Sequence, residues 1–408
     1  MKNPVCMFAL AAVLCGCSSN LKNDVFMVDP DKAMDVTLTD VATDIRIIRL
    51  KSGEPLDNGM YYRFYDNWIL GYAPNSGGIG ASRLYLFDNT GNLVSTLERV
   101  GRGPGEYIGI SKIACLDETN DILHVWVNYS DGMGVLKYHI PDMTFAGVSE
   151  LGQDIHIDDI GELGNGRVLS LVHYPYESYY SFTGQARTVL YDINHIKDSV
   201  VLHTTNWAYH NNAFEDFASN TNKDNPIITL MGYIGSVCRI EGDSLRTVLR
   251  FTFADKGVPK KLFDEADSKG MDEDVSDIAE ELLAYALWGP NDCCLPYVWN
   301  AAQNGNITSF SYTYSQNHGN TFTRLYYLND GKKGVSYRGL TVPGLNLDCR
   351  FNSMNGTSMV GEITNSQDLI DNSAAMSDLG RAIVDSLKLQ NDDNPILLQF
   401  RFNAIKSE

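Results

Sequence analysis

The chain has 408 residues, 44% of them hydrophobic and 11% aromatic, an ordinary globular composition long enough for one large all-β domain or two smaller domains. Lys and Arg together number 32 against 51 Asp and Glu, which gives a formal net charge of -19. Because a strongly acidic surface repels phosphate backbones, this charge argues against nucleic acid as a partner.

The first residues are typical of an export signal. Lys2 precedes an apolar stretch from Val5 to Leu14 that is too short to span a bilayer as a helix. The next residues, Leu14-Cys15-Gly16-Cys17, resemble a bacterial lipobox, in which the cysteine after Leu-x-Gly is acylated and the leader is removed. The resemblance implies a signal peptide over residues 1–16 and a stable lipid anchor on Cys17. An ordinary cleaved signal with chance cysteines is the alternative.

The residues from Ser18 to Asp24 are polar and are typical of a short tether. They lack the compact acidic cluster that resembles a surface-export tag in some outer-membrane lipoproteins. We therefore expect a protein of the cell envelope, anchored in the outer membrane and facing the periplasm. No later apolar run is long enough to predict a transmembrane helix.

Five cysteines follow the anchor, and their spacing fits no zinc site. They are Cys115, Cys238, Cys293, Cys294 and Cys349. The compartment permits a disulfide, and one bridge is conceivable. The adjacent Cys293 and Cys294 are instead expected to be buried filler or an isolated thiol pair.

Short strands dominate the chain from Met60 onward. They are rich in aromatic and β-branched residues and are separated by turns such as Asn329-Asp330-Gly331. Closely spaced strands without helices between them predict a sandwich, a barrel or a propeller, and their number favours the propeller. The expected strands include Met60–Tyr65, Trp68–Tyr72, Arg83–Phe87, Asn92–Leu97, Ile110–Leu116, Ile122–Asn128, Val135–Ile140, Arg167–His173 and Arg187–Ile193.

Two segments break this rhythm with helical spacing of apolar residues. They are Pro259–Trp288 and Ser377–Leu389, and we expect both to be short helical insertions on or beside an all-β propeller. The chain then closes with a strand over Asn394–Phe402. Ile122–Val127 is apolar on both faces, which is typical of a strand packed between neighbouring blades.

One loop holds three glycines and a proline within five residues: Gly101-Arg102-Gly103-Pro104-Gly105-Glu106-Tyr107. Such a run cannot form regular structure and predicts a shaped loop. It resembles the signature of a family of six-bladed β-propeller lipoproteins abundant in Gram-negative gut anaerobes. The hairpin Leu86–Asn92 is similar to the blade hairpin of NHL-repeat propellers. The resemblance implies a lipidated tether over residues 17–35 and a six-bladed propeller over residues 36–408, and it implies little chemistry.

This loop, the signature loop, is the first candidate site. Arg102 offers a bidentate donor to a carboxylate or a sugar, with Glu106 beside it and Tyr107 as a stacking face. In the alternative, the glycines and Pro104 shape a corner between blades, which Arg102 locks by pairing with Glu106 or with a backbone carbonyl. We favour the structural role.

Two aromatic loops are the second candidate. One is the run His173–Tyr180, which contains Tyr174 and Tyr176, and the other surrounds Trp207. Aromatic residues mixed with polar ones are typical of surfaces that recognise glycans or peptides. The alternative is that these loops pack over the ends of the blades.

No catalytic signature is present. The histidines form no paired metal-binding motif, and the run Asp154–Asp159 is explained better by a solvent-facing strand than by a metal site. Nucleophile elbow, P-loop and dinucleotide motifs are missing. The sequence therefore predicts no catalytic residue, no metal ligand and no cofactor.

The leading hypothesis is a binding or scaffold propeller held to the membrane by Cys17, with its site at one end of the central channel. A propeller hydrolase or lyase acting on a carbohydrate or lactone is the rival. It needs His, Asp or Glu around the channel mouth, for example around a bound Ca²⁺. A structural subunit of an envelope complex is a third option.

Overall fold

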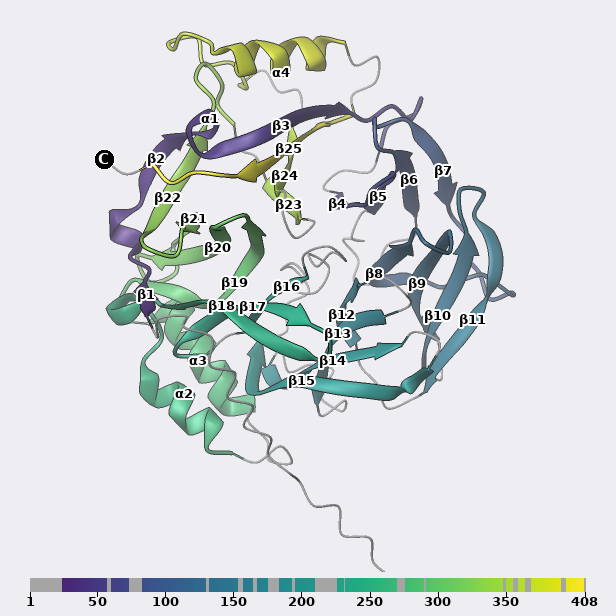
Figure 1. Cartoon of the computed structure of the whole chain (residues 1–408), viewed down its shortest axis with the longest axis horizontal. Helices are drawn as coiled ribbons and strands as arrows, with labels where there is room; N and C mark the ends of the chain where they lie inside the picture. Colours follow the sequence, from purple (N-terminus) through teal and green to yellow (C-terminus); the bar gives the residue numbers. More distant parts are fainter. Residues whose placement is uncertain are drawn as a thin grey trace, which may run out of the picture.

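The chain forms six β-sheets arranged as blades around a central axis in the computed structural model (Figure 1). The structure describes residues 24–56, 60–72, 83–129, 132–152, 157–163, 167–174, 183–192, 195–209, 226–230, 232–269, 276–289, 291–347, 350–354, 359–363, 368–389 and 394–406. The sheets follow one another around the ring in chain order. The predicted six-bladed β-propeller is therefore confirmed.

Blades 1, 2 and 3 each consist of four consecutive antiparallel strands, as the short strands of the sequence predict. Blade 1 contains β4 (Tyr61–Phe64), β5 (Trp68–Tyr72), β6 (Leu84–Asp88) and β7 (Leu93–Leu97). Blade 2 contains β8 (Ile110–Asp117), β9 (Ile122–Tyr129), β10 (Gly132–His139) and β11 (Thr144–Gly152). Blade 3 contains β12 (Ile157–Glu162), β13 (Arg167–Tyr174), β14 (Thr183–Asp192) and β15 (His195–Tyr209).

Blades 4, 5 and 6 each take one strand from the N-terminal part of the chain. Blade 4 contains β16 (Ile227–Leu230), β17 (Gly235–Glu241), β18 (Ser244–Thr252) and β1 (Val25–Met27). Blade 5 contains β19 (Cys293–Asn304), β20 (Ile307–Gln316), β21 (Thr321–Asn329), β22 (Gly334–Thr341) and β2 (Met34–Thr37). Blade 6 contains β23 (Arg350–Met354), β24 (Met359–Ile363), β25 (Ile396–Phe402) and β3 (Ala42–Arg49).

The N-terminal segment thus runs along the outer edge of three successive blades (Figure 1). β1 is parallel to β18, β2 is parallel to β22, and β3 pairs antiparallel with β25, which closes the ring. Residues 25–35 belong to the stretch that was expected to be a tether, but in the structure they include β1, η1 and the start of β2. Phe26 and Val28 pack into the apolar core between blades 4 and 5, which holds this stretch in the fold.

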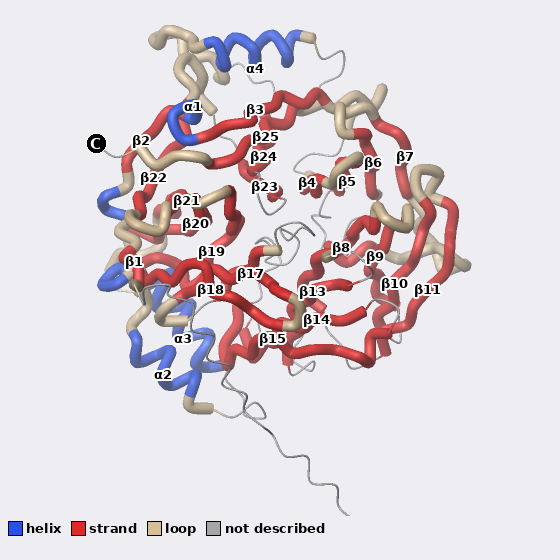
Figure 2. Tube along the Cα trace, viewed as in Figure 1, coloured by secondary structure: helices blue, strands red, loops and turns tan. Residues whose placement is uncertain are grey.

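The helices lie at the edge of the ring of strands (Figure 2). They are α1 (Leu38–Val41), α2 (Lys260–Asp267), α3 (Ser276–Trp288) and α4 (Asp378–Lys388), with 3₁₀ turns η1 (Pro30–Lys32) and η2 (Ala254–Lys256). The helical insertion predicted over Pro259–Trp288 is confirmed and contains α2 and α3. The insertion predicted over Ser377–Leu389 is confirmed as α4, whose first turn is capped by the Ser377 hydroxyl, which accepts from the Gly380 N–H.

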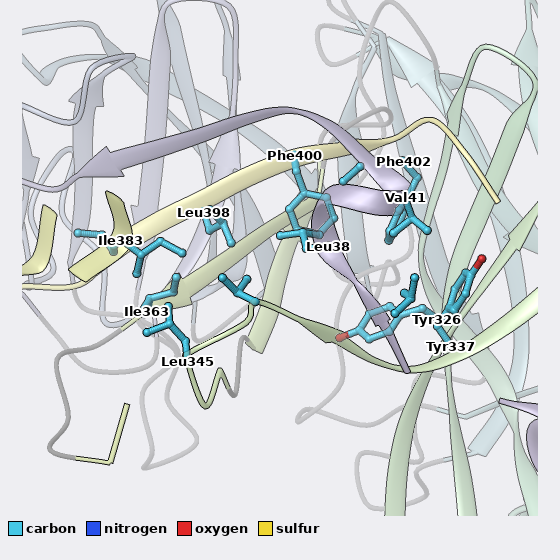
Figure 3. Packing of buried hydrophobic residues seen from close by; sticks show 14 of the residues in the cluster. Leu38, Val41, Tyr326, Tyr337, Leu345, Ile363, Ile383, Leu398, Phe400 and Phe402 are labelled. Atoms are coloured by element: carbon cyan, nitrogen blue, oxygen red, sulfur yellow. The ribbon is translucent and has the colours of Figure 1, made fainter. Parts of the chain in front are cut away.

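The apolar core is divided among the gaps between blades. Between blades 5 and 6, Leu38 of α1 and Ile383 of α4 join Leu398 and Phe400 of β25 in one buried cluster (Figure 3). In β9, Leu123, Val125 and Val127 pack against blade 1, and the other side of the same strand is also buried. This confirms that Ile122–Val127 lies between neighbouring blades.

Candidate functional site

The signature loop connects β7 of blade 1 to β8 of blade 2. Its two ends are tied together by backbone hydrogen bonds: the Gly101 N–H donates to the Tyr107 carbonyl at 2.9 Å, and the Tyr107 N–H donates to the Arg99 carbonyl at 3.0 Å. Inside the loop, the Glu106 N–H donates to the Gly103 carbonyl at 3.0 Å. The loop is therefore a closed turn that is held by its own backbone hydrogen bonds.

Side chains fix this turn from both sides. The Glu106 carboxylate folds back and accepts the Gly103 N–H at 2.7 Å, a charge-assisted bond. Gly105 has a φ of +71°, and a Cβ atom there would lie 2.6 Å from the Phe145 ring. The Tyr138 hydroxyl donates to the Gly105 carbonyl at 2.9 Å. Glycine is required at this position for both its backbone angle and its close contact with blade 2.

Tyr107 is buried and is not a stacking face for a ligand, so that prediction is wrong. Its hydroxyl accepts the Arg99 N–H at 3.1 Å and donates to the Leu97 carbonyl at 3.2 Å. Burial raises the pKa of the Tyr107 hydroxyl above its ordinary value, and the phenol stays neutral. Two tethered backbone groups and an apolar surrounding leave this ring no access to ligand.

Arg102 is exposed at the tip of the turn. Within the described ranges it forms no ion pair with Glu106, so the predicted locking pair is absent there, and Glu106 is used by the backbone instead. The favoured structural role of the loop as a blade corner agrees with these contacts. Only Arg102, of the three residues predicted in the loop, is free of the corner's hydrogen bonds among the residues that the structure describes.

The second candidate site lies at one end of blade 3. His173 and Tyr174 are the last two residues of β13, and Trp207 is close to the end of β15. The pairing register places His173 opposite Ala186 of β14, and Ala186 opposite Thr205 of β15. A bulge between Gly184 and Ala186 locally widens the β14–β15 pairing. The fold therefore brings the two predicted aromatic segments to the same end of blade 3, on two strands that are separated by β14.

The blade-3 end and the signature loop lie on the same side of the propeller. In blades 1 and 3 the fourth strand, β7 or β15, leads to the next blade, and the antiparallel strands of each blade alternate in direction. The exits of these fourth strands therefore lie at one end of the channel. Tyr176 and Cys17 lie outside the described residues, as do residues 210–212 of the second aromatic loop.

A family profile described as a 6-bladed beta-propeller, DUF5128, matches residues 18–287 of this chain. The chain belongs to this family. The match begins directly after Cys17 and includes the N-terminal strands, the signature loop and the blade-3 end. Membership in the family assigns the propeller fold, and no curated protein matches the sequence.

Solved structures with similar architecture are distant. A crystal structure of a member of the duf4221 family from Bacteroides vulgatus has 7% identity and a TM-score of 0.41, covering 90% of this chain and 98% of that chain. The WD40 domain of Toxoplasma gondii coronin has 11% identity and a TM-score of 0.37, covering 92% and 89%. These values support no statement about function.

Two buried polar side chains of this family member were not predicted as site residues. Arg63 lies on β4, and its guanidinium carbon is 6.0 Å from the centre of the Tyr72 ring. His124 lies on β9 with its ring 6.5 Å from that of Trp126 in an edge-on arrangement. Both residues could have been noticed in the sequence, because each is an ionisable residue within a run of aromatic and aliphatic residues.

Burial sets the protonation state of His124 and of two cysteine thiols at pH 7. It lowers the pKa of His124 to about 4, with the nearby Lys137 adding to the shift, so the imidazole is neutral at pH 7. Burial also raises the pKa of the Cys238 thiol to about 11 and of the Cys293 thiol to about 12. These thiols are free and protonated, and are therefore poor nucleophiles.

The predicted thiol pair is present as buried neighbours. The Cys293 thiol donates to the Cys294 carbonyl at 3.3 Å, and both thiols are free. Cys349 lies outside the described residues. Across the described ranges, no group of three or more His, Cys, Asp and Glu side chains is placed to hold a metal ion, and no helix is long and apolar enough to cross a membrane.

Proposed function

We propose that this chain is a lipid-anchored propeller of the bacterial cell envelope that binds a glycan at the blade-3 end. The observation that carries the proposal is the register of blade 3, which assembles His173, Tyr174 and Trp207 from two separate segments. Neighbouring strands lie about 4.8 Å apart, so the backbones of β13 and β15 lie about 10 Å from each other across the sheet. Histidine, tyrosine and tryptophan are residue types that can stack on a sugar ring and also form hydrogen bonds with it.

The signature loop supports this assignment by exclusion. Tyr107 and Glu106 are used by the corner, so of the two sites predicted from the sequence the blade-3 end is the one whose aromatic residues are not assigned to the corner. The net charge of -19 disfavours a strongly anionic ligand and is compatible with a neutral glycan. The lipobox-like Leu14-Cys15-Gly16-Cys17 supports the anchor, and the polar residues after Cys17 support a periplasmic orientation from the outer membrane.

Binding is tested with the full chain on an oligosaccharide array and a peptide array. We expect oligosaccharide binding that is lost in Trp207→Ala and Tyr174→Ala. Trp288→Ala is the matched control, because Trp288 is an exposed tryptophan on α3, outside blade 3. Binding that survives both blade-3 variants contradicts the assigned site, and binding to peptides alone replaces the glycan with a peptide ligand.

The same samples separate a binding protein from an enzyme. Each oligosaccharide that binds is incubated with the protein, and the products are analysed by mass spectrometry. An unchanged oligosaccharide supports the binding propeller, whereas cleavage supports the hydrolase or lyase alternative.

The anchor is tested by cell fractionation of the natural chain and of Cys17→Ser. We expect the natural chain in the outer-membrane fraction and the variant in the soluble periplasmic fraction. Co-purification of an envelope protein that depends on the blade-3 end, but not on added glycan, identifies the scaffold form of this function.

A further inference from the structure

Apolar side chains remain exposed around the first strand of the fold. Met27 of β1 is 63% exposed, and Ile234, just before β17, is 46% exposed. β1 pairs with the end of β18, which places Met27 opposite Thr252, and the Thr252 hydroxyl donates to the Tyr233 carbonyl at 3.4 Å. Val25, Met27, Tyr233 and Ile234 therefore form one neighbouring set, which we call the N-terminal patch.

The patch is held in place by the fold. Between Val25 and Met27, the Phe26 side chain packs against the core of blades 4 and 5, which leaves its two neighbours facing outward. The Tyr233 ring lies 6.4 Å from the Phe263 ring of α2, and the Lys260 ammonium lies 6.0 Å from the centre of the Tyr233 ring. A fixed tyrosine beside aliphatic side chains has the amphipathic character favoured at a bilayer interface.

The charge around the patch differs from that of the whole protein. Residues 24–32 and 250–261, which flank the paired ends of β1 and β18, contain five Lys and Arg against four Asp. The chain as a whole has 32 Lys and Arg against 51 Asp and Glu. Several of these local charges are paired, such as Lys256 with Asp31 at 2.7 Å. An anionic lipid surface would repel most of this protein but would not repel this region.

The proposed anchor lies very close to the patch along the chain. Only the seven residues 18–24 separate Cys17 from Val25. At about 3.6 Å per residue even when fully extended, this stretch keeps Val25 within about 30 Å of the lipidated residue. Blade 1, by contrast, lies across the ring from blade 4, the blade that β1 completes.

We propose that the N-terminal patch rests on the bilayer in which Cys17 is anchored, so that blade 4 contacts the lipid and blade 1 faces away from it. The inference rests on the proposed lipid anchor. The lipid surface is the occupant that explains all three observations: exposed apolar side chains with a tyrosine, a surround that is close to neutral in an otherwise acidic protein, and a seven-residue link to the acylated cysteine. The patch gives the lipid attachment a fixed orientation.

The test uses the lipidated full chain in vesicles of phosphatidylethanolamine with a minor fraction of phosphatidylglycerol. An environment-sensitive fluorophore is attached to Ile234→Cys or, as the matched control, to Val94→Cys on β7 of blade 1, where Val94 is 43% exposed. Cys349 is replaced by Ser in both chains. We expect a blue-shifted emission and at least threefold stronger quenching by spin-labelled lipid at position 234 than at position 94.

The outcomes separate this inference from the anchor on which it rests. Equal, weak quenching at both positions in a lipidated chain overturns the patch and leaves the anchor intact. The mass of the N-terminal peptide reads the anchor directly, and an unmodified Cys17 overturns the anchor and the inference together. Protection of position 234 in native envelopes but not in purified vesicles identifies a protein partner instead of lipid and also overturns the proposal.

A second variant tests whether the quenching at position 234 depends on the apolar side chains of the N-terminal patch. Met27→Ser combined with Tyr233→Ser removes apolar surface without touching the buried Phe26. Met27 is largely exposed and Tyr233 partly so, and the Tyr233 ring also contacts Phe263, so we expect only a small fall in the unfolding midpoint, together with a loss of the difference in quenching between positions 234 and 94. A difference that persists in this variant overturns the role of the patch.

Discussion

The ring is held together in two different ways at opposite sides. Between blades 1 and 2, the signature loop forms a corner from residues that are close in sequence, such as Tyr107 and Arg99. Across blades 4, 5 and 6, the outer edge is completed by β1, β2 and β3, whose partners lie hundreds of residues later. The hydrogen bond from Arg46 to Gln399, for example, joins residues separated by 353 positions.

A sequence motif is informative where the fold imposes a requirement on a few consecutive residues. A corner must meet a local requirement, such as a glycine at positive φ, and so it leaves a visible signature. Closure by a distant strand requires only an apolar and β-branched segment of suitable length, which many sequences contain. The junction that is easiest to recognise is therefore not the one that joins the two ends of the chain.

The largest effect is expected from Leu38→Ala in α1. Leu38 is buried between blades 5 and 6 beside Phe400, so the substitution leaves a cavity at the closure (Figure 3). We expect the free energy of unfolding to fall by about 2–5 kcal/mol. Urea unfolding measures it, with Val94→Ala on the exposed edge of blade 1 as the control, for which a change below about 0.5 kcal/mol is expected. Similar small losses in both variants contradict a stabilising role for the closure.

A slightly smaller effect is expected from Gly105→Ala in the signature loop. The new methyl group would meet the Phe145 ring, and the backbone would remain at a φ that disfavours alanine. We expect a loss of about 2–4 kcal/mol in the free energy of unfolding. Gly331→Ala is the matched control, since Gly331 also has a positive φ, +82°, and open space around it. The difference between the two variants isolates the Phe145 contact, and equal losses would show that only the backbone angle matters.

These two sites also show how far the sequence predicts the molecule. Strands such as Trp68–Tyr72 and the helix beginning after Ser377 were readable from spacing and capping, because both depend on local physics. The role of residues 25–35 was not readable, since burial of Phe26 and Val28 depends on blades 4 and 5 far along the chain. The burial of Tyr107 was missed for the same reason.

The blade-3 end was predicted only in part. The aromatic composition of the segments around Tyr174 and Trp207 is visible in the sequence. Their position at the same end of blade 3 follows from the register of β13, β14 and β15, which a sequence without a fixed repeat does not reveal.

His124 is a buried side chain of β9, and it predicts that the free energy of unfolding depends on pH. Burial holds the pKa of His124 at about 4, below its ordinary value of 6.5. Between pH 6.5 and pH 4 the unfolded chain therefore binds more protons than the folded one, and stability falls as the pH falls. The loss attributable to this residue reaches about 3 kcal/mol near pH 4 and vanishes above pH 6.5.

The measurement compares His124→Phe with the natural chain in urea unfolding at several pH values. Carboxylates titrate in both proteins, so the difference between the two curves reports on His124. We expect the variant to gain stability relative to the natural chain as the pH falls from 6.5 to 4. A difference that does not change with pH contradicts a buried, neutral imidazole.

The smallest changes in stability are expected from single substitutions in the signature loop, one at the buried Tyr107 and one at the exposed Arg102. Tyr107→Phe removes a hydroxyl that accepts the Arg99 N–H and donates to the Leu97 carbonyl, so we expect a loss of about 1 kcal/mol in the free energy of unfolding. Arg102→Ala removes an exposed side chain, and we expect a change within about 0.5 kcal/mol. Urea unfolding of both variants and glycan-array binding of Arg102→Ala give the readouts. A large loss of stability in Arg102→Ala would indicate that Arg102 does pair with Glu106, which the hydrogen bond of Glu106 to the Gly103 N–H argues against. A loss of binding without a loss of stability moves the ligand site from blade 3 to the corner, and the local junction would then carry function as well as shape.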